Sequence, residues 1–398
     1  MSGLRHILIV MLAVLQLLLT TSCYGLRQIN ELALVTAVGL DIGKEPGSVK
    51  LSVQIIRPAD ARGQTGAPAG GTGQPIYSIS AEGRSIFEAI RNLGHFTSRR
   101  VYWAHNFLIV MQEDYARRGI SDMIDFFTRN HELRMNTWVA VTPDSPDEVI
   151  STITGLEVVP GEAVDRLFRN VEIVGLAPAS NMRSLEEAYM SQSVQPVIAK
   201  IRLVPRGISN KKPEEHGSLN QVELAGAAVF QKDKMAGWLS FKETRGLMYF
   251  LQNLRSADEV VDCPNSKDNF VTVEFKQMDF KVAPAYINGL PRFHIRLKNK
   301  ADVVENNCGR TTAELRQEIQ EAVDQKVTAE IQSVIAKLQQ QYQSDVLKLG
   351  DVFRNKFPVE WQRIGADWNA VFAKAETTVE VQTTIKSTVL KAGKQGVK

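Results

Sequence analysis

The sequence has few cysteines, few aromatic residues and little excess of charge of either sign. Its 398 residues include three Cys, and Phe, Trp and Tyr together make up 7%. Lys and Arg number 47 against 44 Asp and Glu, which gives a net charge of +3. No basic block with interleaved aromatic residues occurs, and this argues against nucleic acid as a partner. With 44% hydrophobic and 23% charged residues, the composition is that of an ordinary globular protein.

Sequence motifs for catalysis, cofactor binding and metal binding are also missing. Residues 39–45 (GLDIGKE) have three residues between the glycines where a phosphate-binding loop needs four. Residues 70–73 (GGTG) lack the flanking strand and helix of a dinucleotide site. None of the six histidines has metal-ligand spacing, and no Gly-x-Ser-x-Gly elbow occurs. The sequence therefore predicts a protein that is not an enzyme, with no cofactor and no metal, although inspection does not test for a distant pair of catalytic carboxylates.

The first 22 residues have the three parts of a secretory signal peptide. Arg5 and His6 precede an apolar run from Ile7 to Leu19, which only Gln16 interrupts, and Thr and Ser residues then lead to Cys23. The run is short for a permanent bilayer span, which needs about 20 apolar residues. The sequence therefore predicts an exported chain that begins near Cys23.

The cysteine at the end of this segment resembles that of a bacterial lipoprotein signal, in which the thiol receives a diacylglycerol. We expect Cys23 to become an N-palmitoyl, S-diacylglycerol cysteine that anchors residues 23–398 to a membrane. Thr20 departs from the Leu, Val or Ile that such signals usually carry three positions before the cysteine. An uncleaved membrane anchor and ordinary secretion are the alternatives.

Strands and helices alternate through the N-terminal region, residues 23–209. Residues 33–41 and 49–55 predict a hairpin. The Gly-rich residues 59–74 predict a mobile surface loop, because they carry no large apolar side chain. Ser85 and Glu88 form a capping-box pattern for a helix that ends at Gly94. The remaining patterns predict strands at 76–80, 101–111 (with Trp103 and His105) and 137–141, and helices that begin at Ser121 and Ser145 or span 161–168 and 184–190.

A polar stretch at 210–220 is interpreted as a linker to a C-terminal domain, residues 221–398. Residues 224–230 and 236–239 predict a hairpin, and 243–254 a helix. Three further segments predict an antiparallel sheet with a tight turn at Asn288-Gly289: residues 271–275, 280–286 and 293–297. A last strand is predicted at 377–385, followed by a polar tail at 391–398.

Two further features concern the C-terminal domain. Cys263 and Cys308 flank its strands and are a candidate disulfide pair in an exported protein, with two free thiols as the alternative. Apolar residues recur every three or four positions from 311 to 349, behind a capping box at Thr311 and Glu314, and predict one long amphipathic helix. Their spacing favours a helix packed on the sheet over a coiled coil. The fold class predicted is α+β, with successive mixed or antiparallel sheet domains and packed helices.

Several segments carry a resemblance to a known family. They are 23–32 (CYGLRQINEL), 81–93 (AEGRSIFEAIRNL), 98–105 (SRRVYWAH), 125–134 (DFFTRNHELR), 226–239 (GAAVFQKDKMAGWL), 243–246 (ETRG) and 345–361 (DVLKLGDVFRNKFPVEW). Together they resemble the Ger(x)C family, the C-subunit lipoproteins of spore nutrient germinant receptors. Tyr24-Gly25 stands where the family usually has Trp-Asp after the lipidated cysteine.

The resemblance implies a protein held by its lipid on the outer face of the spore inner membrane. Members of this family act with two polytopic subunits, A and B, in a complex that senses small nutrients such as amino acids or sugars and starts germination. The C subunit has no known chemistry of its own. We therefore expect neither catalysis nor direct nutrient binding by this chain.

Under this resemblance, several charged residues are candidates for a partner surface, since Arg and Trp are over-represented at interface hot spots. They are Arg84, Arg99, Arg100, Glu132, Arg134, Glu243 and Arg245. The alternative is structural, with these charges as helix caps or intramolecular pairs. For Trp103 and Trp238 we expect positions in the core.

Two other classes of function are weighed against the receptor subunit. A lipid-anchored solute-binding protein needs two lobes around a cleft, and usually a longer run of βαβ units than this sequence shows. A cell-wall hydrolase would degrade peptidoglycan. Direct binding of a nutrient would distinguish the first from a receptor subunit.

Overall fold

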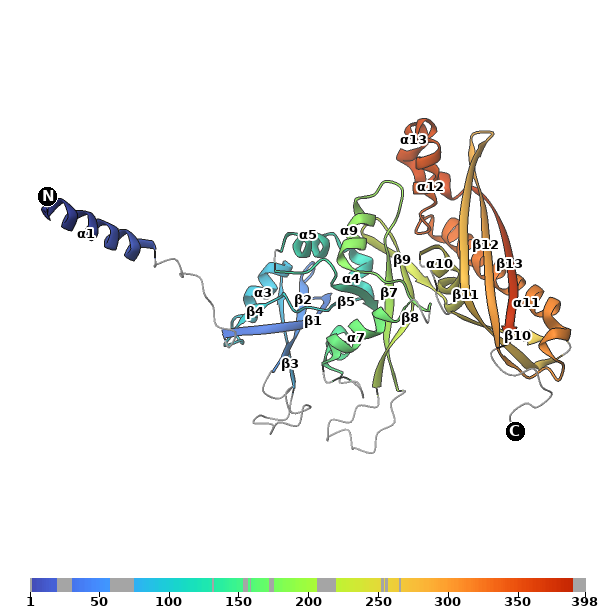
Figure 1. The fold of residues 1–398 in the computed structure, drawn as a ribbon, viewed down its shortest axis with the longest axis horizontal. Helices are drawn as coiled ribbons and strands as arrows, with labels where there is room; N and C mark the ends of the chain where they lie inside the picture. The colour runs from blue at the N-terminus through green and yellow to red at the C-terminus, as the bar shows by residue number, and fades with distance from the viewer. Residues whose placement is uncertain are drawn as a thin grey trace.

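The structure is a computed structural model that describes residues 2–19, 31–57, 75–130, 132–152, 157, 159–171, 175–205, 220–251, 254, 257–264 and 266–388. Cys23, the predicted loop 59–74, most of the predicted linker and the tail 391–398 lie outside these residues. Helix α1 (Ser2–Leu19) lies apart from the rest of the chain (Figure 1). No helix within the described ranges is both long enough and apolar enough to cross a bilayer.

Two β-sheets with packed helices form the described chain, which confirms the α+β class (Figure 1). The first sheet has nine strands in the order β3-β2-β1-β5-β6-β7-β8-β9, with β4 paired to β1 beside this path. The second has four, in the order β10-β11-β12-β13. The strands are β1 Leu32–Ile42, β2 Val49–Ile56, β3 Ile76–Gly83, β4 Arg100–Tyr102, β5 Leu108–Gln112, β6 Trp138–Thr142, β7 Val197–Pro205, β8 Asn220–Gln231, β9 Lys234–Leu239, β10 Asp258–Cys263, β11 Ser266–Ile287, β12 Leu290–Asn306 and β13 Glu376–Thr388.

Helices cover both faces of the first sheet. Its central strands run parallel and are buried on both sides. Side chains of β5 therefore alternate between two cores: Ile109 belongs to the first core, and Leu108 and Val110 belong to the second. Helices α3 (Ile86–Leu93), α4 (Glu113–Arg118), α5 (Ser121–Arg129) and α9 (Met182–Met190) pack in the first core. Helices α6 (Pro146–Ser151) and α7 (Pro160–Arg169) pack in the second.

The second core continues without a break into the C-terminal sheet. It includes Val149 of α6, Leu247 of α10 (Phe241–Leu251), Ile295 of β12 and Ile331 of α11 (Thr312–Ala336). Strand β8 pairs with β7 on one side and β9 on the other. The predicted linker at 210–220 therefore falls between two paired strands of one sheet, and its residues up to 219 are outside the described chain.

The predicted strand 101–111 is wrong as a single element. A turn at residues 103–107 divides it into β4 and β5, because the backbone N–H of Asn106 bonds to the carbonyl of Trp103 at 2.9 Å. Both strands pair with β1, β4 at its start and β5 further along. Trp103 and His105 lie in this turn, where the indole is buried and the imidazole is exposed.

The helix starts were predicted with mixed success. Ser85 caps α3 and accepts the N–H of Glu88 at 3.2 Å, as predicted, but the Glu88 carboxylate bonds to the backbone of Arg84. Ser121 makes no cap, because α5 already begins at that residue and Ile120 holds the cap position. Ser145 lies at the cap position of α6 without a side-chain bond.

The C-terminal sheet is built on one long hairpin. Asn288 and Gly289 have φ of 53° and 79°, the left-handed conformation that a two-residue turn requires, so the predicted turn is confirmed. The strands predicted at 271–275 and 280–286 are one strand, β11, with a register shift between Phe275 and Gln277. Cys263, at the end of β10, is joined to Cys308, after β12, by a disulfide with a Cα–Cα distance of 5.7 Å.

The long helix packs on this sheet, as predicted, but ends earlier. The capping box of Thr311 and Glu314 starts α11. Near its middle, Asp324 and Gln320 accept the backbone N–H groups of Thr383 and Ile385 on β13, at 2.7 and 3.0 Å. After α11 a π-helical turn runs to Tyr342, and Gln343, with φ of 47°, ends the helix there instead of at 349.

Residues 343–348, which follow α11 and its π-helical turn, connect the C-terminal helices to the first sheet. Backbone Gln195, before β7, donates to the carbonyl of Asp345 at 2.9 Å, and Ser344 donates to the carbonyl of Phe230 on β8 at 2.6 Å. Three short helices follow: α12 (Leu349–Lys356), α13 (Pro358–Ile364) and α14 (Trp368–Phe372).

Candidate functional site

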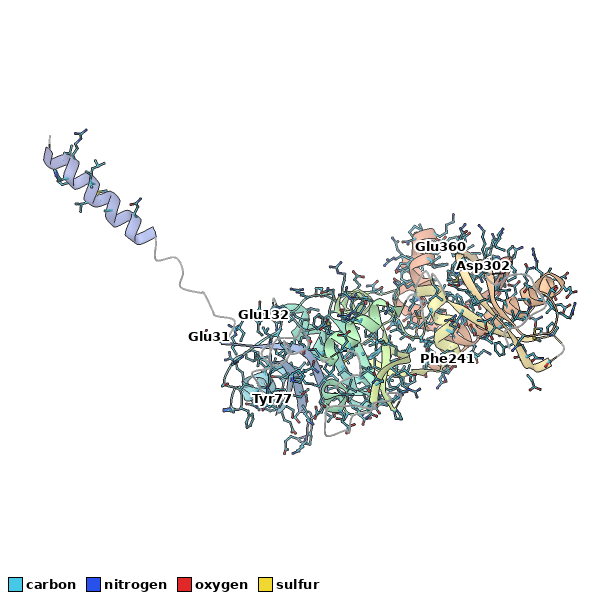
Figure 2. All side chains as sticks on the ribbon, turned by 60° about the horizontal axis from the view of Figure 1, so that its bottom comes forward. Glu31, Tyr77, Glu132, Phe241, Asp302 and Glu360 are labelled. Atoms are coloured by element: carbon cyan, nitrogen blue, oxygen red, sulfur yellow. A yellow bond between two sulfur atoms is a disulfide. The ribbon has the colours of Figure 1, made fainter. Side chains whose placement is uncertain are left out.

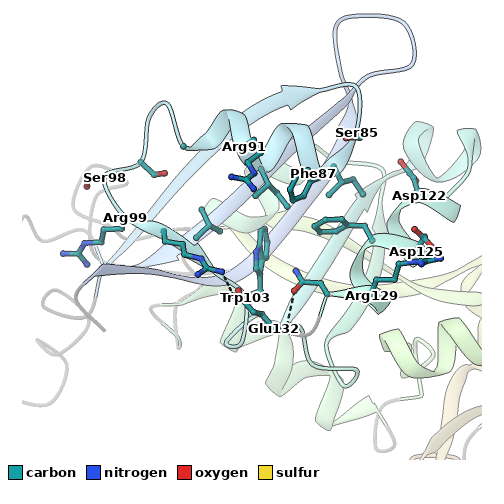
Figure 3. Close-up of a pocket in the computed structure, with 18 residues that line it drawn as sticks. Ser85, Phe87, Arg91, Ser98, Arg99, Trp103, Asp122, Asp125, Arg129 and Glu132 are labelled. Carbon is teal, nitrogen blue, oxygen red and sulfur yellow. Dashed lines mark hydrogen bonds and ion pairs between the residues drawn. The ribbon is translucent and has the colours of Figure 1, made fainter. Parts of the chain in front are cut away.

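A wide concavity lies between α3 and α5, with β4 beneath (Figure 3). We call it the α3/α5 groove and define it by Phe87, Ile90 and Arg91 of α3, Arg99, Arg100 and Trp103 around β4, Phe126 and Arg129 of α5, and Glu132. It opens to solvent and carries both apolar and charged side chains, which is the make-up of a site that binds another molecule.

The floor of the groove is apolar. The indole of Trp103 is buried and packs edge-on against Phe127 at 6.1 Å, and Phe127 packs against Phe126 at 5.1 Å. Figure 3 shows Trp103 between Phe87 above and Glu132 below. Packing of this kind fixes the floor, since the rings hold one another in place.

Local sequence explains why α3 and β4 meet at this position. Gly83 ends β3, and a Cβ there would lie 2.5 Å from the backbone nitrogen of Ala89, so only glycine lets the helix lie this close to the strand. After α3 the Thr97 hydroxyl donates to the carbonyl of Leu93 at 3.1 Å and turns the chain toward Arg99. The start of β4 then pairs with the start of β1, Arg100 opposite Leu32.

Ion pairs fix several of the charged groups on the rim. The Arg100 guanidinium lies 2.8 Å from the Glu132 carboxylate, and Glu132 is further held by its backbone bond to Asn130 at 3.0 Å. Arg129 pairs with Asp125 one turn earlier on α5, at 2.6 Å. The Arg129–Asp125 pair is exposed at both ends, and such a pair contributes little stability, about 0 to 1 kcal/mol.

Two other arginines on the rim are not neutralised in this way. Arg91 lies over the ring of Phe87, 5.0 Å from its centroid, and Arg99 is exposed at the other side. Neither forms an ion pair with an acid in the part of the chain that the structure describes. The groove therefore offers two cations to an approaching anion.

Large apolar side chains are exposed beside these cations. Phe87 is 53% exposed on the rim and Phe96, in the turn after α3, is 67% exposed. Burying a Phe side chain is worth roughly 1.5–3 kcal/mol, so a partner that covers these rings gains affinity. Phe87, Arg91 and Phe96 were not among the residues predicted from the sequence, although Phe87 and Arg91 have the Phe-x-x-x-Arg spacing of one helical turn.

The structure brings some of the predicted surface residues together and separates others. Arg99, Arg100 and Glu132 line the groove from two segments. Arg84 flanks it beside Glu88, and Arg134 is exposed just beyond it.

The remaining two predicted residues lie on α10, outside the groove. Glu243 accepts the backbone N–H of Ser240 at 2.7 Å and lies 3.9 Å from Lys337, so it acts as a helix cap. Arg245 is 4% exposed and pairs with Glu259 at 3.0 Å. Its assignment to a surface was wrong, because a buried guanidinium needs a buried acid and cannot reach a partner.

The two tryptophans occupy different environments. Trp103 lies in the core, as described above. Trp238 on β9 is half-buried, and its ring lies beneath the ammonium group of Lys200, 4.6 Å away.

Buried charges near Arg245 form a structural cluster. Glu259 accepts from Arg245, Lys326 and Tyr249 at 3.0, 2.8 and 3.1 Å. Nearby Glu330 is 5% exposed, and burial, together with the negative charge of Glu259, raises its pKa to about 7. The cluster ties α10, β10 and α11 together. Among the described residues, no group of three or more His, Cys, Asp or Glu side chains is placed to bind a metal.

Two family models match this chain. The model described as "Spore germination protein N-terminal domain" matches residues 25–203. The model described as "Spore germination B3/ GerAC like, C-terminal" matches residues 225–389. The chain belongs to the Ger(x)C family. This confirms the resemblance in the sequence, and it makes the chain a member of the family of spore germinant receptor C subunits.

Relatives of the Ger(x)C protein cover nearly its whole length. Spore germination protein KC of Bacillus subtilis is 24% identical to this chain, and the matched region covers 97% of each of the two chains. Spore germination protein B3 of the same organism is 21% identical, over 92% of this chain and 93% of the relative. Among solved structures, the crystal structure of the GerBC protein has a similar fold, with a TM-score of 0.53 and 19% identity over 91% of this chain and 99% of that one.

The family resemblance and the groove meet in the same residues. Three of the segments that carry the resemblance, 81–93, 98–105 and 125–134, are distant in sequence and all line the α3/α5 groove. A stability role alone accounts for Trp103, but it does not account for the exposed Phe87, Arg91 and Arg99.

Proposed function

We propose that this Ger(x)C protein is a non-enzymatic, membrane-anchored lipoprotein subunit of a spore nutrient germinant receptor. It is required for the response to germinant through assembly with the polytopic A and B subunits. The observation that carries this proposal is the α3/α5 groove, which gathers exposed apolar rings and two uncompensated arginines on a surface built from family-like segments.

Membrane anchoring is part of the proposal and depends on Cys23. The acylated cysteine holds the chain on the outer face of the spore inner membrane. An N-palmitoyl, S-diacylglycerol cysteine carries several acyl chains, which make a stable anchor, whereas a single chain binds a membrane only marginally. The apolar run before Cys23 supports export.

Affinity capture of the full-length chain from membranes tests the assembly. A tagged protein should co-purify with polytopic membrane chains, identified by mass spectrometry, and spores without the protein should fail to respond to nutrient. If the tagged protein is purified from membranes without any polytopic chain, or if spores without the protein respond normally to nutrient, the assembly role is refuted.

A Cys23→Ala chain tests the anchor. The wild-type chain should carry acyl groups detectable by mass, and the variant should lose them and leave the membrane fraction. A variant that stays membrane-bound, with a wild type that carries no acyl mass, would refute lipidation.

Calorimetry of the protein with amino acids and sugars tests for direct nutrient binding. It should show none; direct binding would favour a solute-binding protein instead.

A further inference from the structure

The α3/α5 groove lies at the end of the molecule where the folded chain begins. Leu32, the first residue of β1, pairs with Arg100 at the groove, and Glu31 and Glu132 lie at the same end in Figure 2, far from Phe241 and Asp302. Cys23 precedes Leu32 by nine residues. Because an extended chain spans at most about 3.6 Å per residue, an anchor at Cys23 keeps the groove within roughly 30 Å of the lipid attachment.

The charges of the groove select the sign of its occupant. The three acids that line the groove are already paired: Glu132 with Arg100, Asp125 with Arg129, and Asp122 with Arg118. Arg91 and Arg99 have no acidic partner among the described residues. Arg84, which pairs with Glu88 at 3.5 Å, stands just outside with its side chain 92% exposed. An anionic group that enters here meets cations on both rims.

The apolar surface of the groove favours an occupant that also carries apolar side chains. Phe87 projects from the rim beside Arg91 (Figure 3). The half-buried Ile90 and Phe126 line the same groove as Trp103. A small free anion would leave these rings in water. A segment with carboxylates on one side and apolar side chains on the other covers both at once, as peptides do in helix-in-groove recognition.

We propose that the α3/α5 groove binds an acidic, amphipathic segment that a multi-spanning membrane partner exposes near the outer bilayer surface. Carboxylates of the segment pair with Arg91 and Arg99, and its apolar side chains cover Phe87, Ile90 and Phe126. The proposal rests on the proposed function, because the partner is a membrane chain of the receptor, and it adds where and by what chemistry that chain is bound.

Charge reversal tests the ionic part in the full-length, membrane-bound protein. The Arg91→Glu/Arg99→Glu variant should lower the yield of co-purified polytopic chain by about tenfold, equivalent to about 1.4 kcal/mol. The matched control is Arg316→Glu/Arg363→Glu, which makes the same change of net charge at exposed positions on α11 and α13. The control should retain the wild-type yield.

Photo-crosslinking identifies the occupant. A full-length chain with p-benzoylphenylalanine in place of Phe87 should crosslink to a peptide of a multi-spanning chain that contains Asp or Glu among apolar residues. The same amino acid in place of Phe241, which is 65% exposed on the distant α10, should not. An acid-to-Lys change in the crosslinked peptide should restore capture by the Arg91→Glu/Arg99→Glu variant.

Other outcomes overturn the proposal. Crosslinks at position 87 only to lipid, only to a second copy of this chain or to a basic peptide would show a different occupant. Equal capture by the reversal and control variants would show that the groove is not the docking site, although assembly itself stands. If even the wild type captures no polytopic chain, the proposed function fails, so the two failures are distinguishable.

Discussion

The indole nitrogen of Trp368 donates a hydrogen bond to the carboxylate of Asp345 at 2.9 Å, in an environment with no exposure to solvent. The same carboxylate accepts three backbone N–H groups, from Leu347, Leu349 and Gly350, at 3.1, 3.2 and 2.7 Å. One side chain therefore organises the connection between α11 and α12, and that connection bonds to the first sheet at β8 and just before β7.

Removal of this carboxylate should destabilise the protein strongly. The Asp345→Ala variant leaves four buried donors without an acceptor, and each unsatisfied group costs about 1–3 kcal/mol. We expect a loss of at least about 3 kcal/mol in the free energy of unfolding, measured by denaturant titration of the purified chain. Asp367→Ala is the control, since Asp367 is exposed and makes no side-chain cap bond. Equal midpoints for the two variants would contradict the role of Asp345.

Glu330 should make stability depend on pH. Its pKa in the folded protein is raised to about 7 from 4.5, chiefly by burial and then by repulsion from Glu259, while Lys326, Arg245 and Lys242 oppose the shift. The folded state therefore binds more protons than the unfolded state between these values, so this group's contribution is favourable below about pH 4.5 and falls as pH rises to about 7.

The Glu330→Gln variant should remove that fall. It should gain stability relative to wild type between about pH 5 and 7, by at most about 3 kcal/mol at 1.36 kcal/mol per pKa unit. Thermal unfolding across this pH range measures the effect, and Glu321→Gln, at an exposed position of the same helix, serves as control. Parallel pH profiles for wild type and Glu330→Gln would show that Glu330 is not the responsible group.

The Cys263–Cys308 disulfide should stabilise the C-terminal sheet. It closes a segment with a sequence separation of 45, and cross-links over such lengths typically contribute 2–4 kcal/mol. Reduction, or the Cys263→Ser/Cys308→Ser variant, should lower the thermal midpoint by several degrees. Peptide mapping under non-reducing conditions should recover the linked peptides; recovery of two free thiols in the mature protein would disprove the bond.

Reversal of the arginines at the start of β4 should abolish function while the fold persists. In Arg99→Glu/Arg100→Glu, two acids replace cations on the rim, and Glu132 loses the partner that lies at 2.8 Å. Both arginines are exposed, so the unfolding midpoint should change little. Spores with this variant should not respond to nutrient, although immunoblotting finds the protein in their membranes. A normal response would exclude an interface at this position.

Alanine variants of Trp103 and Phe96 should differ in stability, because Trp103 is buried and Phe96 is exposed. Trp103→Ala should cost about 3–5 kcal/mol, because it opens a cavity against Phe127. Phe96→Ala should leave the unfolding free energy within about 0.5 kcal/mol, since the ring is exposed. Chemical denaturation of both variants measures this difference, and a large loss in Phe96→Ala would show that this ring packs in the fold.

Much of the fold was predictable from local patterns. The β1–β2 hairpin, the Asn288-Gly289 turn and the capping box at Thr311 each depend on neighbours in sequence, and each is confirmed. The end of α11 was not predictable in this way. Val346 continues the helical spacing of apolar residues, but it is buried by contacts that form only after the chain leaves the helix at Gln343.

The candidate site was predictable only in part. Arg99, Arg100 and Glu132 were identified from family-like segments, whereas nothing local distinguished them from Arg245. That arginine is buried because Glu259, on another element, compensates its charge. The division of the 101–111 strand likewise depends on β1, whose pairing β4 and β5 share.

The continuous first sheet limits where the chain can be divided into fragments. A fragment cut at 210–220 would separate β8 from β7 and leave long unpaired strand edges on both pieces. Such pieces would associate through those edges and would report contacts that the whole chain never makes. Experiments on parts of this protein should therefore keep β1 to β9 in one polypeptide.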